Sequence, residues 1–161
     1  MKGKYLILGS NIGDRISNIQ IAVSKISTIV GEVVRASSIY LTEPWGHKEQ
    51  AAFYNQVVEI KTELDAFETL NKLLAIEESM GRVRKKKWAE RIIDIDILYY
   101  DDLIISKENL SIPHPGIPDR RFVLIPLCEL IPDSIHPVWK VSNADLLKAT
   151  KDHLGVKKVQ H

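Results

Sequence analysis

The chain of 161 residues, 45% of them hydrophobic, is long enough for one domain with a packed core, and we assign residues 1–161 to that single domain. A formal net charge of +1 argues against a dedicated nucleic-acid binder, which carries positive charge over a whole face. The single Cys128 excludes an internal disulfide framework and a multi-cysteine zinc site. No apolar stretch approaches the roughly 18 residues of a membrane span, so we expect a cytoplasmic protein with no membrane partner.

The first quarter of the chain predicts a strand, a helix and a second strand. Residues 5–8 are an apolar run typical of a buried strand, and the turn at 9–14 leads into a helix with apolar side chains at helical spacing that stops at Gly31. The glycines of that turn lack the spacing of phosphate-binding loops, so we interpret it as a turn and helix cap. Residues 33–41 predict the second strand.

A polar segment, residues 42–52, separates this part from the next strand. Its Pro and Gly residues predict a loop, and loops of this length often cover a binding site. Trp45 has two interpretations, an anchor for the loop or a wall over a flat ligand. Asn55, near the start of the strand at 53–60, either satisfies a turn or offers the paired donor and acceptor that recognise a heterocycle.

A second helix is expected to begin at Asp65 and to end at Gly81. Asp65 and Glu68 have the spacing of a capping box. Glu77 occupies a position where the helical period demands an apolar residue. It is either a salt-bridged residue at the helix end or an acid that faces a site.

The segment 82–96 joins a cationic loop to a strand that carries two acids. Because side chains alternate along a strand, Asp94 and Asp96 share one face, with Cα atoms about 6.6 Å apart. Both carboxylates can therefore approach one hard cation, or bridge two, and such oxygen ligands suit Mg²⁺. The preceding loop offers a clamp for a polyphosphate through its cationic side chains, which are Arg82, Arg84, Lys85, Lys86, Lys87 and Arg91.

Each half of this segment also has a simpler interpretation. An Asp-x-Asp pair is often a solvated sheet face, and a Lys/Arg run is often a solvated loop, a nuclear signal or an RNA-binding patch. The direct succession of loop and strand favours the site for a metal and a polyphosphate.

The last third predicts shorter elements. We expect a hairpin at 101–105, a strand at 110–115 that its prolines confine to an edge, and a helix opened by Pro118. His114 is held between two prolines and is suited to contact a phosphate. A short helix begins near Ser142, and the tail from about residue 151 is expected to be frayed.

The order strand, helix, strand, strand, helix, strand is that of ferredoxin-like α+β folds. We therefore predict a three-layer α-β-α sandwich with a largely antiparallel sheet and helices on its faces.

Several motifs together resemble one family, that of 6-hydroxymethyl-7,8-dihydropterin pyrophosphokinase of folate biosynthesis. In chain order they are Gly9-Ser10-Asn11, Tyr40-x-Thr42-x-Pro44, Phe53-x-Asn55, Glu77-x-x-x-Gly81-Arg82-x-Arg84, Trp88-x-x-Arg91-x-x-Asp94-x-Asp96, and Pro113-His114-Pro115 followed by Arg120-Arg121-Phe122. The likeness covers about residues 5–135.

The resemblance implies a Mg²⁺-dependent kinase that moves the β,γ-pyrophosphoryl group of ATP to the hydroxymethyl group of a reduced pterin and releases AMP. It implies that Asp94 and Asp96 hold two Mg²⁺ ions and act in catalysis with Arg82 and Arg91. The implied ATP-binding residues are Glu77, Arg84, Lys87, Trp88, Ile97, His114 and Arg120. The implied pterin-binding residues are Thr42, Glu43, Pro44, Trp45, Phe53, Asn55 and Phe122. ATP and the pterin would be the partners of a monomer.

The chain departs from the family pattern in three places. Ala89-Glu90 stands where Gly-Pro is usual, Lys87 where Arg is common, and Gly116 lacks a cationic side chain often found after the Pro-His-Pro motif. Lys87 cannot bind a phosphate bidentately, and Glu90 adds negative charge.

Two alternative functions remain open at the level of the sequence. The same acids could serve another two-metal nucleotidyl or phosphoryl transferase. A ferredoxin-like module could instead bind RNA through its sheet and residues 85–87, with an affinity that falls steeply with salt.

Overall fold

The computed structural model describes residues 3–42, 51–81 and 92–159. The elements along the chain are β1 (Lys4–Ser10), α1 (Arg15–Ile29), β2 (Glu32–Ala36), β3 (Tyr40–Thr42), β4 (Phe53–Lys61), α2 (Ala66–Ser79), β5 (Asp94–Tyr100), β6 (Ile105–Lys107), β7 (Leu110–Ile112), a 3-10 turn (Ile117–Asp119), α3 (Arg121–Leu130), α4 (Asn143–Ala149) and β8 (Val156–Lys158).

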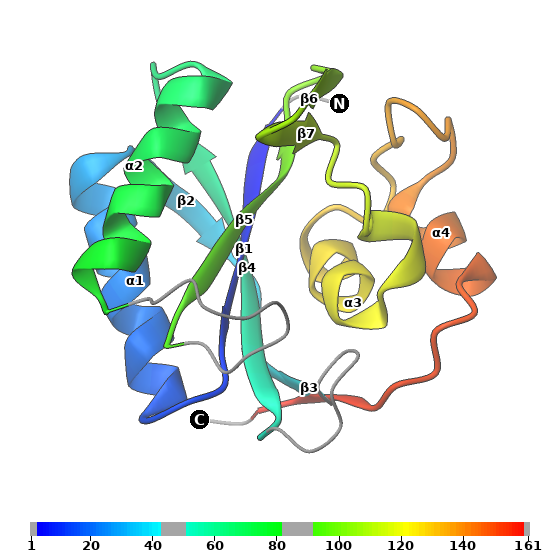
Figure 1. Cartoon of the computed structure of the whole chain (residues 1–161). Helices are drawn as coiled ribbons and strands as arrows, with labels where there is room; N and C mark the ends of the chain where they lie inside the picture. Colours follow the sequence, from blue (N-terminus) through cyan, green and yellow to red (C-terminus); the bar gives the residue numbers. More distant parts are fainter. Residues whose placement is uncertain (1–2, 43–50, 82–91, 160–161) are drawn as a thin grey trace.

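An antiparallel sheet forms the middle layer. Its strand order is β5-β1-β4-β3-β8, and β2 pairs with β4 beside β3. Helices α1 and α2 cover one face, and α3 and α4 lie on the other (Figure 1). This arrangement confirms the predicted α+β sandwich with a largely antiparallel sheet.

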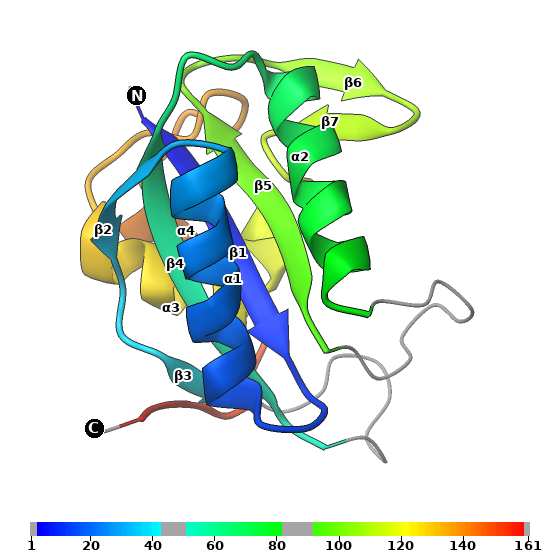
Figure 2. The ribbon, with the colours of Figure 1, turned by 90° about the vertical axis from the view of Figure 1, so that its left-hand side faces the viewer.

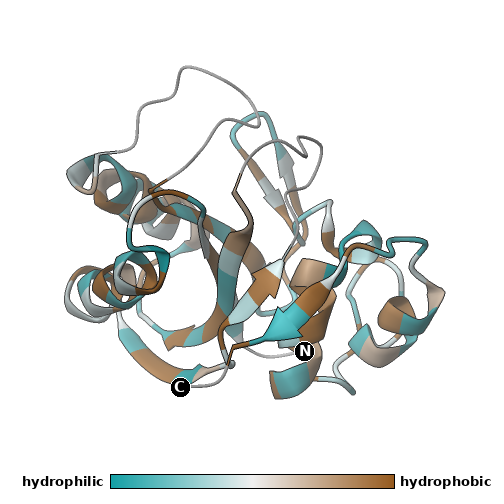
Figure 3. Cartoon of the chain, turned by 90° about the horizontal axis from the view of Figure 1, so that it is seen from below, coloured by the Kyte–Doolittle hydropathy of each residue, from teal (hydrophilic) through white to brown (hydrophobic). Residues whose placement is uncertain are grey.

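Each face of the sheet has its own hydrophobic core. On one side, α1 lies across the strands and α2 lies beside β5 (Figure 2), and buried side chains such as Leu8, Ile26 and Leu73 fill the space between them. On the other side Val57, Leu124 and neighbouring residues pack beneath α3 and α4. Hydrophobic positions recur between hydrophilic ones along the helices that flank the sheet (Figure 3), as expected for amphipathic helices that bury one stripe.

Strand β5 lies at one edge of the sheet and alternates between the two cores. Ile93, Ile95 and Ile97 belong to the core under α1 and α2. Asp94 and Asp96 therefore point to the face that carries α3, as the period of two in a strand requires. Both acids are only partly buried.

The predicted start of α2 is confirmed in detail. The Asp65 side chain accepts the Glu68 backbone N–H at 2.8 Å, and the Glu68 side chain accepts the Asp65 N–H at 3.0 Å. Because this capping box satisfies two helix-terminal donors, it fixes where α2 begins and hence where Glu77 lies on it.

The strand expected at 33–41 is interrupted and forms β2 and β3. Val57 N–H donates to the Ser37 hydroxyl at 3.0 Å, and the Ser38 N–H and hydroxyl both donate to the Glu129 carboxylate of α3. These side-chain bonds interrupt the regular ladder after Ala36, although Ser37 N–H still donates to the Val57 carbonyl, which is why the prediction of one continuous strand was wrong.

Three predicted elements after β5 also differ. The hairpin is formed by β6 and β7, not by residues 101–105, and α3 begins at Arg121 after a 3-10 turn instead of at Pro118. The tail expected to fray from about residue 151 is ordered as far as β8, which pairs with β3. Within the described residues, none of the helices has the length and apolar composition needed to cross a bilayer.

Candidate functional site

Three neighbouring strands bring Asn55, Gly9 and Asp94 into one row. Gly9 pairs with Asn55 on β4 and with Asp94 on β5. Directly opposed residues in an antiparallel ladder project to the same face, so the amide of Asn55 and the carboxylate of Asp94 lie on either side of a glycine. The next row places Ile7 between Val57 and Asp96.

Gly9 keeps the space between those two side chains open. A Cβ at this position would lie 2.6 Å from Asn55 Nδ2 and 3.4 Å from a ring carbon of Phe53. The first distance is too short for any side chain unless Asn55 moves. Glycine is therefore required here for close approach, and Phe53 and Asn55 occupy the room that it leaves.

Asn55 is fixed by hydrogen bonds although it is almost fully buried. Its Oδ1 accepts from the Thr42 hydroxyl at 2.9 Å, and its Nδ2 donates weakly to the Leu8 carbonyl at 3.4 Å. Thr42 is also buried, and it pairs with Phe53 between the adjacent strands β3 and β4. The structure thus brings together Thr42, Phe53 and Asn55, three of the residues predicted to bind the pterin.

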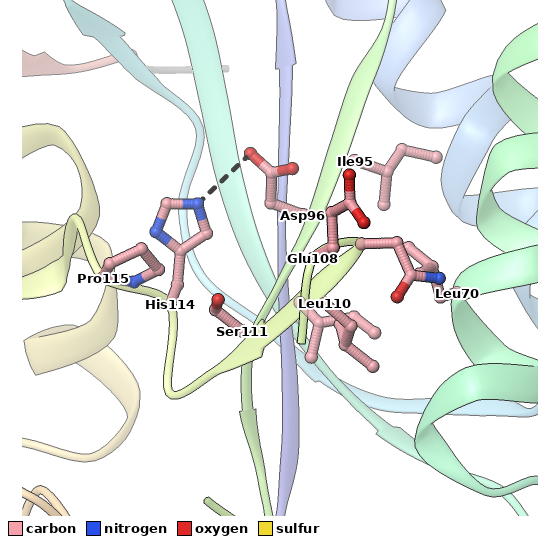
Figure 4. Close-up of a pocket in the computed structure, with 10 residues that line it drawn as sticks. Leu70, Ile95, Asp96, Glu108, Leu110, Ser111, His114 and Pro115 are labelled. Carbon is pink, nitrogen blue, oxygen red and sulfur yellow. Dashed lines mark ion pairs between the residues drawn. The ribbon is translucent and has the colours of Figure 1, made fainter. Parts of the chain in front are cut away.

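His114 lies beside Asp96, and the open edge of β5 holds it there. Its backbone N–H donates to the Leu98 carbonyl at 2.9 Å. Its Nε2 lies 3.9 Å from Asp96 Oδ2, with the two side chains 22% and 45% exposed, and Figure 4 shows them facing each other.

The imidazole of His114 is neutral at physiological pH. Burial and, secondly, the positive charge of Arg120 lower its pKa to about 4, against an opposing effect of Asp94. Its Nδ1 accepts the Gly116 N–H at 2.9 Å, so the single proton of the neutral ring resides on Nε2 and points to the acid pair. The site therefore offers a neutral donor next to Asp96.

Glu77 reaches β5 from α2. Its side chain is 1% exposed, and Oε2 accepts the backbone N–H of Ile95 at 2.7 Å. Ile95 stands between Asp94 and Asp96, so this buried acid holds the segment that carries the acid pair. Its carboxylate is thus directed at the backbone of the strand that carries the acid pair.

Arg120 and Phe122 flank the first residue of α3. The guanidinium carbon of Arg120 lies 5.8 Å from the centre of the Phe122 ring, and Phe122 packs on the core beneath α3. A Cβ at Gly116 would lie 2.9 Å from Arg120 Nε. The glycine that departs from the family pattern therefore makes room for Arg120.

A cavity of about 230 Å³ opens beside these residues, between β5, α2 and the β6–β7 hairpin. Asp96 and His114 lie at one end, while Leu70 and the hairpin residues Glu108, Leu110 and Ser111 surround the rest (Figure 4). Ile97, predicted to bind ATP, lines it as well. The hairpin residues and Leu70 were not predicted, because nothing in their sequence links them to β5 before the fold is known.

The acid pair fits a hard divalent cation. Among the described residues, no three His, Cys, Asp or Glu side chains gather closely enough to hold a metal ion. Two carboxylates on one face of β5, of which Asp96 borders the cavity, would leave the other coordination positions to water and phosphate oxygens, which is the donor set that Mg²⁺ uses with nucleotides.

The remaining predicted site residues lie outside the described part of the chain. They are Glu43, Pro44 and Trp45 of the first loop and Arg82, Arg84, Lys87, Trp88 and Arg91 of the second.

Comparisons with known proteins agree with each other. The family model described as 7,8-dihydro-6-hydroxymethylpterin-pyrophosphokinase (HPPK) matches residues 5–132. A 2-amino-4-hydroxy-6-hydroxymethyldihydropteridine pyrophosphokinase of Aquifex aeolicus is 42% identical over 136 residues, which are 84% of this chain and 84% of that protein. The folic acid synthesis protein fol1 of Pneumocystis carinii is 40% identical over 92% of this chain, which corresponds to only 20% of that longer protein.

Solved structures show a similar fold. The HPPK-DHPS of Plasmodium falciparum, solved with SDX-DHP, matches with a TM-score of 0.72 at 19% identity. The match covers 92% of this chain and 43% of that one. This chain thus spans less than half of the structure that it resembles.

Proposed function

The chain belongs to the 7,8-dihydro-6-hydroxymethylpterin pyrophosphokinase family, and from this premise we infer that it transfers pyrophosphate from ATP to 6-hydroxymethyl-7,8-dihydropterin in folate biosynthesis. The hydroxymethyl oxygen forms a bond to the β-phosphorus, the bond from that phosphorus to the oxygen of AMP breaks, and the hydroxyl proton is lost. The products are AMP and the pterin diphosphate.

The observation that best supports this assignment in the site is the row of Asn55, Gly9 and Asp94. In this row only Gly9 separates the buried amide of Asn55, which suits a heterocycle, from the carboxylate of Asp94, which suits cation-bound phosphates. A pterin at Asn55 would thus present its hydroxymethyl group toward the acid pair. Positioning of this kind supplies most of the rate enhancement in phosphoryl transfer.

We propose that Thr42, Phe53, Asn55 and Phe122 bind the pterin. Phe53 and Phe122 offer aromatic faces on the same side of the sheet, and Thr42 orients the Asn55 amide by donating to its Oδ1. The predicted roles of Glu43, Pro44 and Trp45 in this pocket are part of the same proposal.

We propose that ATP occupies the cavity beside β5, with its phosphates toward Asp96. His114 would donate a hydrogen bond from Nε2, and Arg120 would add positive charge next to it. Ile97 lines this cavity and Glu77 holds β5 beside it. Arg82, Arg84, Lys87, Trp88 and Arg91 are proposed to bind the triphosphate from the cationic loop.

We propose that Asp94 and Asp96 hold the Mg²⁺ ions that accompany ATP. When bound, these ions neutralise the phosphate oxygens and acidify the attacking hydroxyl. The half-exposed state of both acids and their common face support this assignment.

Phosphorus NMR of the protein with ATP, Mg²⁺ and 6-hydroxymethyl-7,8-dihydropterin tests the reaction. We expect AMP and a pterin diphosphate in equal amounts. Release of ADP or of free pyrophosphate would instead identify another phosphoryl or nucleotidyl transferase. Unchanged ATP in the presence of a folded protein would overturn the assignment.

We also propose that the protein acts as a monomer in the cytoplasm. Sedimentation velocity and cell fractionation test these two points.

A further inference from the structure

The end of the chain crosses to the sheet beside the proposed pterin pocket. This C-terminal arm, residues 150–159, runs from α4 to β3 (Figure 1). Within it, β8 pairs antiparallel with β3 and places Val156 opposite Thr42, and Val159 N–H donates to the Ile39 carbonyl at 2.9 Å. The arm therefore supports the strand that ends at Thr42.

Asp152 of the same arm caps α3. It is 9% exposed, its Oδ2 accepts the Arg121 N–H at 2.8 Å, and its Oδ1 accepts the Leu154 N–H at 3.0 Å. The residue at the usual capping position, Arg120, forms no side-chain capping bond. A carboxylate from far along the chain thus satisfies a helix-terminal donor, and its charge is favourable at the positive end of the helix.

The arm makes a second hydrogen bond with the first turn of α3. The Arg121 guanidinium donates to the Leu154 carbonyl at 2.9 Å. Arg121 is therefore bound through both its backbone and its side chain. Of its two neighbours, Arg120 acts on His114 through its charge, and Phe122 packs on the core beneath α3. One short segment ties the two walls of the pocket, Phe122 on α3 and Thr42 on β3.

We propose that Asp152 is a positioning residue for the pterin pocket, which sets the place of Phe122 by fixing the Arg121 N–H. The identity of the ligand in this inference rests on the proposed function, whereas the contact of Asp152 with the start of α3 does not. Because Asp152 fixes the residue that precedes Phe122, its effect should fall on pterin binding. Binding of ATP in the cavity beside β5 should change less.

The test measures binding by calorimetry for Asp152→Ala and Asp152→Asn, with the pterin and with α,β-methylene-ATP and Mg²⁺ as separate probes. The Kd for the pterin should rise about tenfold in Asp152→Ala, as loss of a charged capping bond predicts, and that for the nucleotide by less than about threefold. Asp152→Asn keeps one acceptor oxygen and should recover part of the loss.

Val23→Ala is the control for a general loss of stability, because Val23 belongs to α1 and packs against the core on the opposite face of the sheet. An equal rise of both Kd values in Asp152→Ala, or a pterin Kd no higher than in Val23→Ala, would overturn the proposal. So would a full loss in Asp152→Asn that matches Asp152→Ala.

Hydrogen exchange without ligand keeps the inference separate from the proposed function. The Arg121 amide should exchange at least about tenfold faster in Asp152→Ala than in the parent protein if the cap orders α3, and less so in Asp152→Asn, which keeps an acceptor oxygen. If the parent protein binds no pterin, the proposed function fails while this measurement still decides whether Asp152 fixes the first turn. Unchanged exchange of Arg121 would refute the role of Asp152.

Discussion

Glu77 and Ile95 are joined by a hydrogen bond of 2.7 Å between a buried carboxylate oxygen and a backbone N–H. Ile95 lies on β5, the edge strand of the sheet, where none of the described strands accepts this donor. Since the neighbours of Ile95 are Asp94 and Asp96, one side chain of α2 holds the backbone from which both acids project.

Replacing Glu77 by alanine should therefore loosen that part of β5. A buried N–H without its acceptor costs about 1–3 kcal/mol, so we expect Glu77→Ala to lower the free energy of unfolding by about 2 kcal/mol. Glu77→Gln retains an oxygen of the same reach and should lose less than about 1 kcal/mol. Urea unfolding gives these energies, and faster hydrogen exchange of Ile95 in the alanine variant alone would locate the effect. Equal losses in both variants would show that the charge, not the acceptor, matters.

The acid pair should be needed for activity and not for folding. Both carboxylates are partly exposed and carry like charge, so neutralising one by Asp94→Asn or Asp96→Asn should leave stability within about 1 kcal/mol of the parent. Turnover should fall by about 10³-fold or more, because neutralising the charge of the phosphates is the main contribution of the acid pair to catalysis. Initial rates at increasing Mg²⁺ measure this, and Asp133→Asn, at an exposed acid between α3 and α4, is the control. Near-parent turnover in either variant would remove the acids from the metal site.

The sequence predicted the parts of the site that depend on local pattern. Asp94 and Asp96 share a face because strand periodicity alone dictates it, and Asp65 begins α2 because the capping box is local. The pairing of Gly9 with both Asn55 and Asp94 is set by the register of strands more than 35 residues apart, and no local pattern encodes it.

The same reasoning explains where the sequence misled. Residues 33–41 have the composition of one strand, but Glu129 on α3 draws Ser38 out of the ladder. The charged tail has the composition of a frayed end, but its Asp152 carboxylate accepts a hydrogen bond from the Arg121 N–H at the start of α3. In both cases a single distant acid overrides local propensity.

Gly9 should tolerate no side chain while Asn55 is present. The alanine Cβ would lie 2.6 Å from Asn55 Nδ2, so Gly9→Ala should displace the amide and raise the Kd for the pterin about tenfold. The matched test is a double-mutant cycle. In an Asn55→Ala background the clash disappears, so Gly9→Ala should cost little further affinity. Independent, additive losses in the cycle, measured by calorimetry, would mean that Gly9 acts through something other than Asn55.

His136 should make the fold sensitive to acid. It is buried in the connection between α3 and α4, its Nδ1 accepts the Val138 and Trp139 N–H groups at 3.1 Å, and it contacts the edge of Tyr99. Burial lowers its pKa to about 4, whereas an unfolded histidine titrates near 6.5. Between these values the unfolded chain binds a proton that the folded chain does not. Stability is therefore full above about pH 6.5 and is lost as the pH falls toward 4.

The loss attributable to His136 should be about 2 kcal/mol across that interval, since one pKa unit corresponds to about 1.4 kcal/mol and its loop lies near the surface. His114, whose pKa is lowered in the same direction, should add to the slope of the parent protein. His136→Asn keeps an acceptor near the place of Nδ1 but does not titrate, so its unfolding free energy should be lower at pH 7 and fall less steeply toward pH 4. His153→Asn, at an exposed histidine of the C-terminal arm, is the control substitution. Urea unfolding at half-unit pH steps gives the unfolding free energy of all three proteins. If this free energy fell equally steeply with pH in His136→Asn and in the parent, folding would not change the protonation of His136.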